Sequence, residues 1–152
     1  MDDKKKYILF FLLYFFIIYS FFTLFLENYL SVFLALLISK ILNLGLYNNI
    51  IFSKNIAFVI IPACTCSFEI SLFLAFILAT PKVSIVYKII YALFGIIMIE
   101  FFNVIRIILI IQYHNLLNYN EIHNIISFIL FPIVLILNLI WVRILKYLNV
   151  IE

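Results

Sequence analysis

Long apolar stretches with few or no charges dominate the chain and predict membrane-spanning helices. A helix of about 20 apolar residues crosses the hydrocarbon core of a bilayer. Three stretches reach that length, at residues 7–26, 89–112 and 124–142. A shorter one, residues 67–80, is interrupted only by Glu69 and just reaches across.

The pattern leaves open how residues 29–46 are placed, because Lys40 interrupts this apolar stretch. If it spans, the chain crosses five times and the loop cations divide equally between the two sides. If it lies in or dips into one interface, four crossings remain and both chain ends lie on the same side. Most loop cations are then on that side, and only Lys40 and Lys54 are on the other. The positive-inside rule favours the second arrangement, with both ends cytoplasmic. The cations on that side are Lys4, Lys5, Lys6, Lys82, Lys88, Arg143 and Lys146.

Two short runs at residues 50–52 and 56–61 are rich in Ile, Val and Phe and are too short to cross a bilayer. They favour a small hairpin that ends at Pro62. The pattern therefore predicts an all-α integral membrane protein, a polytopic helical bundle of four to five transmembrane helices with a short β-like outer segment before Cys64. We expect residues 1–152 to form a single transmembrane domain.

Composition supports the membrane prediction. The residue types AVILMFWYC make up 68% of the chain, charged residues make up 11%, and the mean hydropathy is +1.30. Such a chain has too little polar surface for a soluble domain and too little charge for a disordered one. The net charge of +3 comes from scattered Lys and Arg, which suits an anionic bilayer surface and not nucleic acid.

The first span lacks the short h-region and the small-x-small cleavage site of a cleavable signal peptide, so we expect no such peptide.

Arg106 is the strongest chemical clue in the apolar sequence. It lies six residues before Gln112, which places it about 9 Å below the outer end of its span in the four-crossing arrangement. An ionised Arg there costs roughly 2.5–3.5 kcal/mol on insertion scales and usually faces a cavity or a partner. Its spacing puts it on one side of the helix with Glu100 and Asn103. Two structural interpretations stay open: Arg106 reaches the outer headgroups, or it pairs with Glu100.

The four-crossing arrangement places Cys64, Cys66 and His123 at the same outer interface as Arg106. A disulfide between cysteines one residue apart would be badly strained. Packing, a nucleophilic role and metal binding are equally open for the thiols, although no four-ligand zinc set is visible. His123 would be the proton carrier if a thiol reacts, and His114 in the loop is a weaker candidate. A cysteine, a histidine and an arginine together supply what acyl transfer requires.

Several short motifs in a fixed order resemble the archaeosortase/exosortase family of membrane cysteine transpeptidases. They are Ala63-Cys64-Thr65, FLAFILATPK at residues 73–82, Gly95, Asn103-x-x-Arg106 and His123. The resemblance covers about residues 41–141, and an amphipathic stretch and a β-like segment before the Cys are also typical of the family. The family's Gly after Cys-Thr is Cys66 here, so Cys66 is a possible alternative nucleophile. We prefer Cys64, because its distance to the ATPK segment fits the family and Phe68 would be a bulky replacement for Gly.

The resemblance implies a cysteine-dependent transpeptidase or peptidase, multi-pass in the plasma membrane, with its active site facing outward. It would cleave C-terminal sorting signals of exported proteins and transfer them to an anchor group, which implies a lipid-linked acceptor. Cys64 would form a thioester, Arg106 would stabilise the oxyanion, His123 would move protons, and Asn103 would have a supporting role. The partners implied are the sorting region of secreted or surface proteins and the lipid bilayer, with no nucleic acid, cofactor or metal.

Two other functions compete with the enzyme. The first is a small transport or channel subunit in which Glu100, Asn103 and Arg106 line a polar path. Against it, no other span supplies matching polar groups in mid-membrane. The second is an assembly or scaffold subunit, in which 18 Phe and 10 Tyr make lipid-facing and interhelical contacts.

Overall fold

The computed structural model describes residues 3–53, 56–114 and 130–147. This part of the chain is α-helical apart from one small sheet, which confirms the predicted fold class. The elements in chain order are α1 (Asp3–Phe21), the π-helical turn η1 (Phe22–Leu26), α2 (Glu27–Leu42), β1 (Gly45–Tyr47), β2 (Ile50–Ser53), β3 (Ile56–Val59), the 3₁₀ turn η2 (Pro62–Thr65), α3 (Ser67–Ala79), α4 (Ile85–Tyr113) and α6 (Leu130–Tyr147).

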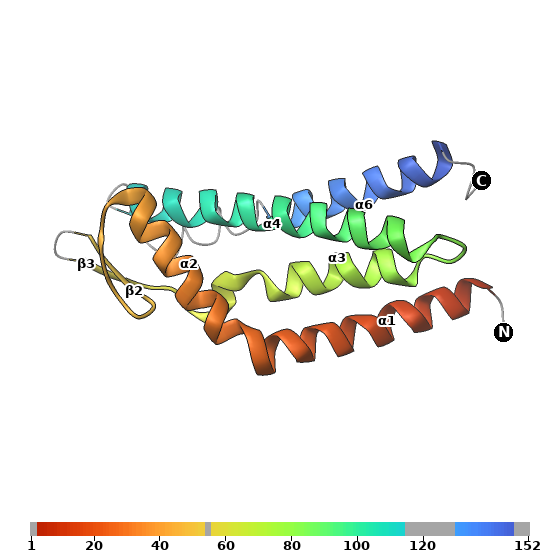
Figure 1. Cartoon of the computed structure of the whole chain (residues 1–152), viewed down its shortest axis with the longest axis horizontal. Helices are drawn as coiled ribbons and strands as arrows, with labels where there is room; N and C mark the ends of the chain where they lie inside the picture. Colours follow the sequence, from red (N-terminus) through yellow and green to blue (C-terminus); the bar gives the residue numbers. More distant parts are fainter. Residues whose placement is uncertain (1–2, 54–55, 115–129, 148–152) are drawn as a thin grey trace.

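Within the described residues, four helical stretches are long and apolar enough to cross a membrane, and α1 with α2 counts as one of them. The other three are residues Pro62–Ala79, Ile85–Tyr113 and Leu130–Tyr147. Figure 1 shows α1, α3, α4 and α6 side by side, with the start of α1, the α3–α4 turn and the end of α6 at one end of the bundle. The sheet lies at the opposite end. The number of spans matches the four-crossing arrangement.

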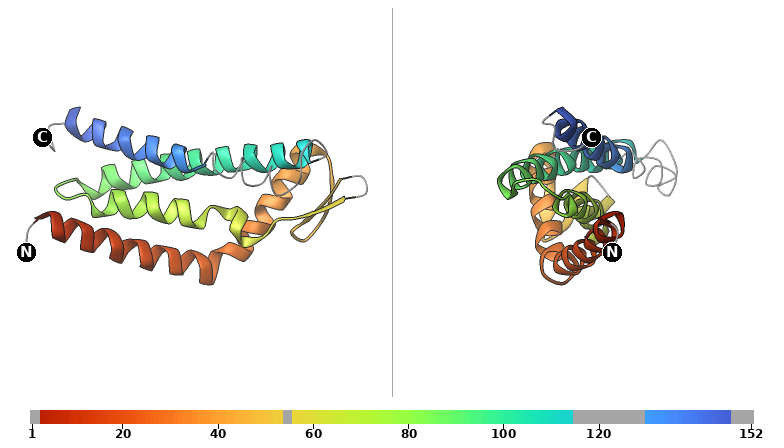
Figure 2. Two further views of the ribbon diagram at one scale, coloured as in Figure 1. Left: turned by 180° about the vertical axis from the view of Figure 1, so that it is seen from behind. Right: turned by 90° about the vertical axis from the view of Figure 1, so that its right-hand side faces the viewer.

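Helix α2 takes a different course from α1 although the two are continuous. Figures 1 and 2 show it leaving the direction of α1 and running obliquely across the bundle towards the end of α4. The change of direction coincides with η1, and a π-turn is a recognised cause of helix bending. The buried residues of α2 follow helical spacing and form one face turned to the bundle; they are Ser31, Leu34, Ala35, Ile38 and Ser39. Lipid therefore does not surround α2 on all sides.

The apolar stretch at residues 29–46 is not one element, which corrects the prediction. Helix α2 ends at Leu42, where Asn43 adopts a left-handed conformation (φ 53°) and its N–H donates to Ser39 O. Asn tolerates this conformation better than most residues and commonly ends helices. Residues 45–47 then form β1, a strand that hydropathy alone did not reveal.

The sheet is antiparallel with strand order β1-β2-β3. The predicted hairpin is confirmed by the pairing of β2 with β3, in which Ser53 lies opposite Ile56. The β1–β2 turn has Asn48 at φ 54°, a conformation that Asn adopts readily in tight hairpins. Asn49 extends the pairing, because its side-chain Nδ2 donates to Ile60 O at 3.0 Å and its carbonyl accepts from the Ile60 N–H at 2.9 Å.

Two buried clusters hold the bundle together. The first joins α3, α4 and α6 and includes Phe73, Ile99 and Trp141. The second joins α2, the sheet and the last turns of α4 and includes Ile38 and Ile51. The cysteine segment lies where the two clusters meet, because Cys66 belongs to the first and Cys64 packs against the second.

Gly95 permits the close approach of α3 to α4. A Cβ atom at this position would overlap the ring of Phe73, which is fully buried. The motif glycine therefore has a packing role in this structure.

Lys88 was expected in a loop but lies inside α4, which corrects the loop assignment. Its side chain is mostly buried and its Nζ donates to Leu78 O at 2.7 Å. A cation near the last carbonyls of α3 complements the negative end of the helix dipole. The other six cations on the side of the chain ends are exposed, so the preferred arrangement is unchanged, although only Lys82 lies in a turn. Lys4, Lys5 and Lys6 lie in α1, and Arg143 and Lys146 lie in α6.

Candidate active site

The turn that carries Cys64 is fixed by its own hydrogen bonds. Pro62 begins the 3₁₀ turn η2, and the Cys64 N–H donates to Ile61 O at 2.8 Å. The buried Thr65 Oγ1 donates to Pro62 O at 2.7 Å and also lies 2.7 Å from Ser67 Oγ. Because the Thr65 hydroxyl has one hydrogen, Ser67 must donate to it. These bonds give the turn a defined shape ahead of α3.

Asn103 joins this turn to α4. Its side chain is 0% exposed, and its Nδ2 donates to Cys64 O at 2.8 Å and to Glu100 Oε2 at 3.2 Å. Both neighbours are acceptors, so the amide nitrogen must point at them and the amide oxygen must point elsewhere. The structure thus brings together two residues that the sequence places 39 positions apart.

Arg106 lies one turn beyond Asn103 and is 7% exposed. This burial contradicts the interpretation that Arg106 reaches the outer headgroups. Arg106, Glu69 and Glu100 lie close enough to Cys66 for their charges to act on its thiol. The cysteine segment and the polar side of α4 therefore form one polar layer, in which Asn103 and Arg106 are buried and Glu69 and Glu100 are partly exposed.

Two buried polar atoms of this layer have no hydrogen-bond partner in the described part of the chain. They are Asn103 Oδ1, an acceptor, and Arg106 Nε, a donor. Buried polar groups are nearly always paired, so unpaired ones often mark a functional site or an unseen ligand. Asn138 Oδ1 on α6 is also unpaired, but only the α4 pair lies beside the cysteines.

The two cysteines differ in accessibility, and both are free thiols. Cys66 is 2% exposed, lies in the apolar cluster of α3, α4 and α6, and has a left-handed backbone (φ 53°). Cys64 is partly exposed. Reactive cysteines are partly accessible, whereas a buried thiol is protected from reagents. Cys64 is therefore the more accessible of the two thiols.

Of the two histidines, the structure describes only His114. His123 lies outside the described residues, so its position relative to Cys64 stays a prediction. His114 ends α4, where its Nδ1 lies 2.6 Å from Ile111 O and its ring packs edge-on against Phe58 with centroids 5.1 Å apart. These contacts give His114 a packing role between α4 and β3.

A curated protein of Methanocaldococcus jannaschii named probable archaeosortase D is similar to this chain. The two are 50% identical over 141 residues, which cover 92% of this chain and 90% of the relative. The chain belongs to the archaeosortase family. No protein-family model matches the chain, and no solved structure matches it.

In this archaeosortase, the cysteine turn contacts the polar side of α4 at Asn103. Asn103 bonds directly to the turn, and α2 packs against η2 from the other side. A water-filled path along Glu100, Asn103 and Arg106 would need that side of α4 to be open. On that side of α4, Asn103 and Arg106 are buried and Glu100 is partly exposed. The described residues contain no group of three His, Cys, Asp or Glu residues that could hold a metal ion.

Sequence reasoning missed three parts of the site. Glu100 was placed on one side of the helix with Asn103 and Arg106 and was considered as a partner of Arg106, yet its hydrogen bond is to Asn103. The i, i+3 spacing of these two residues was the signal that could have shown it. The hydroxyls of Thr65 and Ser67 were not recognised as the support of the turn. The third is α2, which contacts η2 and whose small residues Ser31 and Ala35 are buried.

Proposed function

We propose that this archaeosortase is a membrane-embedded cysteine transpeptidase that cleaves C-terminal sorting signals of exported proteins and transfers them to an anchor group. The observation that carries the proposal is the hydrogen bond from Asn103 to Cys64 O. It holds an accessible cysteine on the same buried side of α4 as an arginine whose Nε has no partner among the described residues.

The chemistry follows from these groups. The Cys64 thiolate attacks the scissile carbonyl, the C–N bond breaks to leave a thioester, and the leaving amine takes a proton from His123. Arg106 donates to the developing oxyanion, and a buried donor with no competing partner is well placed for that role. The acceptor nucleophile then attacks the thioester through a second tetrahedral intermediate and releases the thiol. No step needs a cofactor.

Charge distribution supports an outward-facing site. The exposed basic residues Lys82, Arg143 and Lys146 lie towards the end of the bundle where the chain ends are found. The cysteine turn lies towards the sheet, at the other end. The positive-inside rule assigns the basic end to the cytoplasm of the plasma membrane. A substrate with an outer motif, an apolar helix and a basic tail would then present its scissile bond to Cys64, with a lipid-linked group as acceptor.

The test is processing of candidate substrates in cells that express the chain. Secreted proteins of the source organism that end in a shared motif, an apolar helix and a basic tail are expressed beside it, and loss of the C-terminal segment is followed on gels. Cys64→Ala, Arg106→Ala and His123→Ala should reduce processing to background, and Cys66→Ala should retain it. Undiminished processing in the Cys64→Ala/Cys66→Ala double variant would overturn the proposal.

A further inference from the structure

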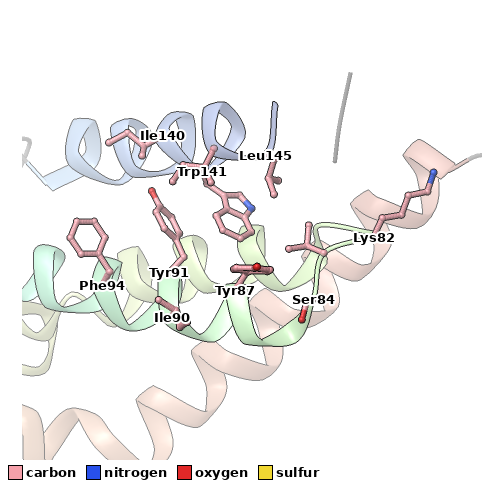
Figure 3. A pocket seen from close by; sticks show the side chains of 11 residues that line it. Lys82, Ser84, Tyr87, Ile90, Tyr91, Phe94, Ile140, Trp141 and Leu145 are labelled. Carbon is pink, nitrogen blue, oxygen red and sulfur yellow. The ribbon is translucent and has the colours of Figure 1, made fainter. Parts of the chain in front are cut away.

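A cleft opens between α4 and α6 at the end of the bundle opposite the sheet. Its volume is about 760 Å³, within the range of small-molecule sites. Figure 3 shows Tyr91 and Trp141 between the two helices, with Lys82 at the end of the cleft near the α3–α4 turn. The remaining residues of its wall are Val83, Ser84, Tyr87, Ile90, Phe94, Ile140, Ile144 and Leu145.

The inner wall of the cleft is apolar because its polar atoms bond inside the protein. The Tyr91 hydroxyl donates to Leu137 O at 2.6 Å, and the Trp141 Nε1 donates to Thr80 Oγ1 at 3.1 Å. The two rings stack with centroids 4.8 Å apart. Aromatic residues that satisfy their polar atoms elsewhere present only their apolar faces. This wall suits a hydrocarbon tail.

The length and charge of the cleft specify the ligand further. From Ser84 to Phe94 the wall follows α4 for ten residues, or about 15 Å at the helical rise. This is about half the hydrocarbon thickness of a bilayer, the depth of one leaflet. Lys82 is exposed at the mouth and is the one charged residue among the described residues that line the cleft. The neighbouring Lys88 does not face the cleft with a free charge, because its Nζ donates to Leu78 O.

We propose that this cleft binds one membrane phospholipid with an anionic headgroup, its tail against Tyr91 and Trp141 and its phosphate at Lys82. A basic residue near a membrane surface attracts anionic lipid. A protein helix with a basic tail is disfavoured by charge, because its cations would meet Lys82 at the mouth. The site is at the other end of the bundle from Cys64, so it is independent of the proposed transpeptidase activity.

Trp141 is the chain's single tryptophan, so its fluorescence reports on the cleft. The full chain is placed in phosphatidylcholine vesicles, and brominated phosphatidylglycerol or brominated phosphatidylcholine is titrated in as the quencher. We expect half-maximal quenching at a mole fraction about fivefold lower for the anionic lipid. Lys82→Gln should remove that difference. Lys146→Gln, which removes a cation at the same end but outside this cleft, should retain it.

Equal quenching by the two lipids would overturn the proposal, because the headgroup would then not be selected. Quenching by neither lipid would also overturn it and would indicate that protein fills the cleft. If Lys82→Gln does not fold, the wild-type chain in 1 M salt gives the same test, since the Debye length falls to about 3 Å and an exposed cation loses its attraction. A lipid preference unchanged by salt would exclude Lys82 as its source.

Discussion

The geometry of the site depends on the side-chain amide of Asn103. It has two donor hydrogens and uses them on Cys64 O and Glu100 Oε2. Removing it would leave a buried carbonyl unpaired, which costs about 1–3 kcal/mol, and would release the cysteine turn from α4. Glu100 acts through Asn103 by taking the second hydrogen, so it is a positioning residue.

Substitutions at Glu100 separate hydrogen bonding from charge. Glu100→Gln keeps an oxygen that accepts from Asn103 and should keep processing within about threefold, whereas Glu100→Leu should lower it about tenfold, close to the value of one hydrogen bond to a charged group. Processing rates of a co-expressed substrate measure both. Glu69→Gln removes a carboxylate that is also near Cys66 and serves as the control. Equal losses in Glu100→Gln and Glu100→Leu would assign Glu100 a role through its charge.

The two thiols should react at different rates. In single-cysteine variants, Cys66→Ser leaves the partly exposed thiol and Cys64→Ser leaves the buried one. We expect maleimide to label Cys64 at least about tenfold faster, because Cys64 is partly exposed and Cys66 is buried. Mass spectrometry of the labelled chain over time measures the two rates, and denatured samples provide the reference. Faster labelling of Cys66 would make Cys66 the better candidate nucleophile.

Among the elements, α3 and α4 form the frame that holds the site, and their separation is set by Gly95 against Phe73. A helix pair this close tolerates little added volume, because protein interiors are packed as densely as organic crystals. Helix α2 completes the frame by covering η2. The buried face of α2 explains why a helix of mostly apolar residues lies across the bundle.

Adding a methyl group at Gly95 should force α3 and α4 apart. Gly95→Ala is expected to destabilise the protein by about 1–3 kcal/mol, the usual cost of overpacking, and to lower its Tm in detergent. Gly45→Ala is the matched control, since a Cβ there would meet Phe52 Cβ at an ordinary 3.6 Å. Phe73→Leu combined with Gly95→Ala should recover part of the loss by making room. An unchanged Tm in Gly95→Ala would show that the helices adjust without cost.

For the whole molecule, the positions of the basic residues and of the two chain ends indicate which side of the membrane the candidate site faces. The start of α1, the α3–α4 turn and the end of α6 share one end, and the sheet lies at the other (Figure 1). Because α1 and α2 count as one candidate span, the described residues hold four candidate crossings, which is an even number. An even number places both ends of the chain on the same side.

Labelling of intact cells tests this orientation. Tyr47 in β1 is 72% exposed and Lys82 in the α3–α4 turn is also exposed, so a cysteine at either position is accessible. In a Cys64→Ser/Cys66→Ser background, a membrane-impermeant maleimide should label Tyr47→Cys in intact cells and Lys82→Cys only after the cells are lysed. The reverse pattern would place the cysteine turn on the cytoplasmic side.

The sequence by itself determined the class of protein, the positions of the main spans, the β2–β3 hairpin and the motif residues Cys64, Asn103 and Arg106. Hydropathy and motif spacing are local properties, so they can be read without the fold. Tertiary structure decided what depends on contacts between distant segments. Hydropathy does not show the direction of a helix such as α2, and only the fold shows that it leaves the direction of α1 and packs one face against the bundle. The bond from Asn103 to Cys64, the burial of Cys66 and the cleft beside Trp141 likewise arise from packing between helices.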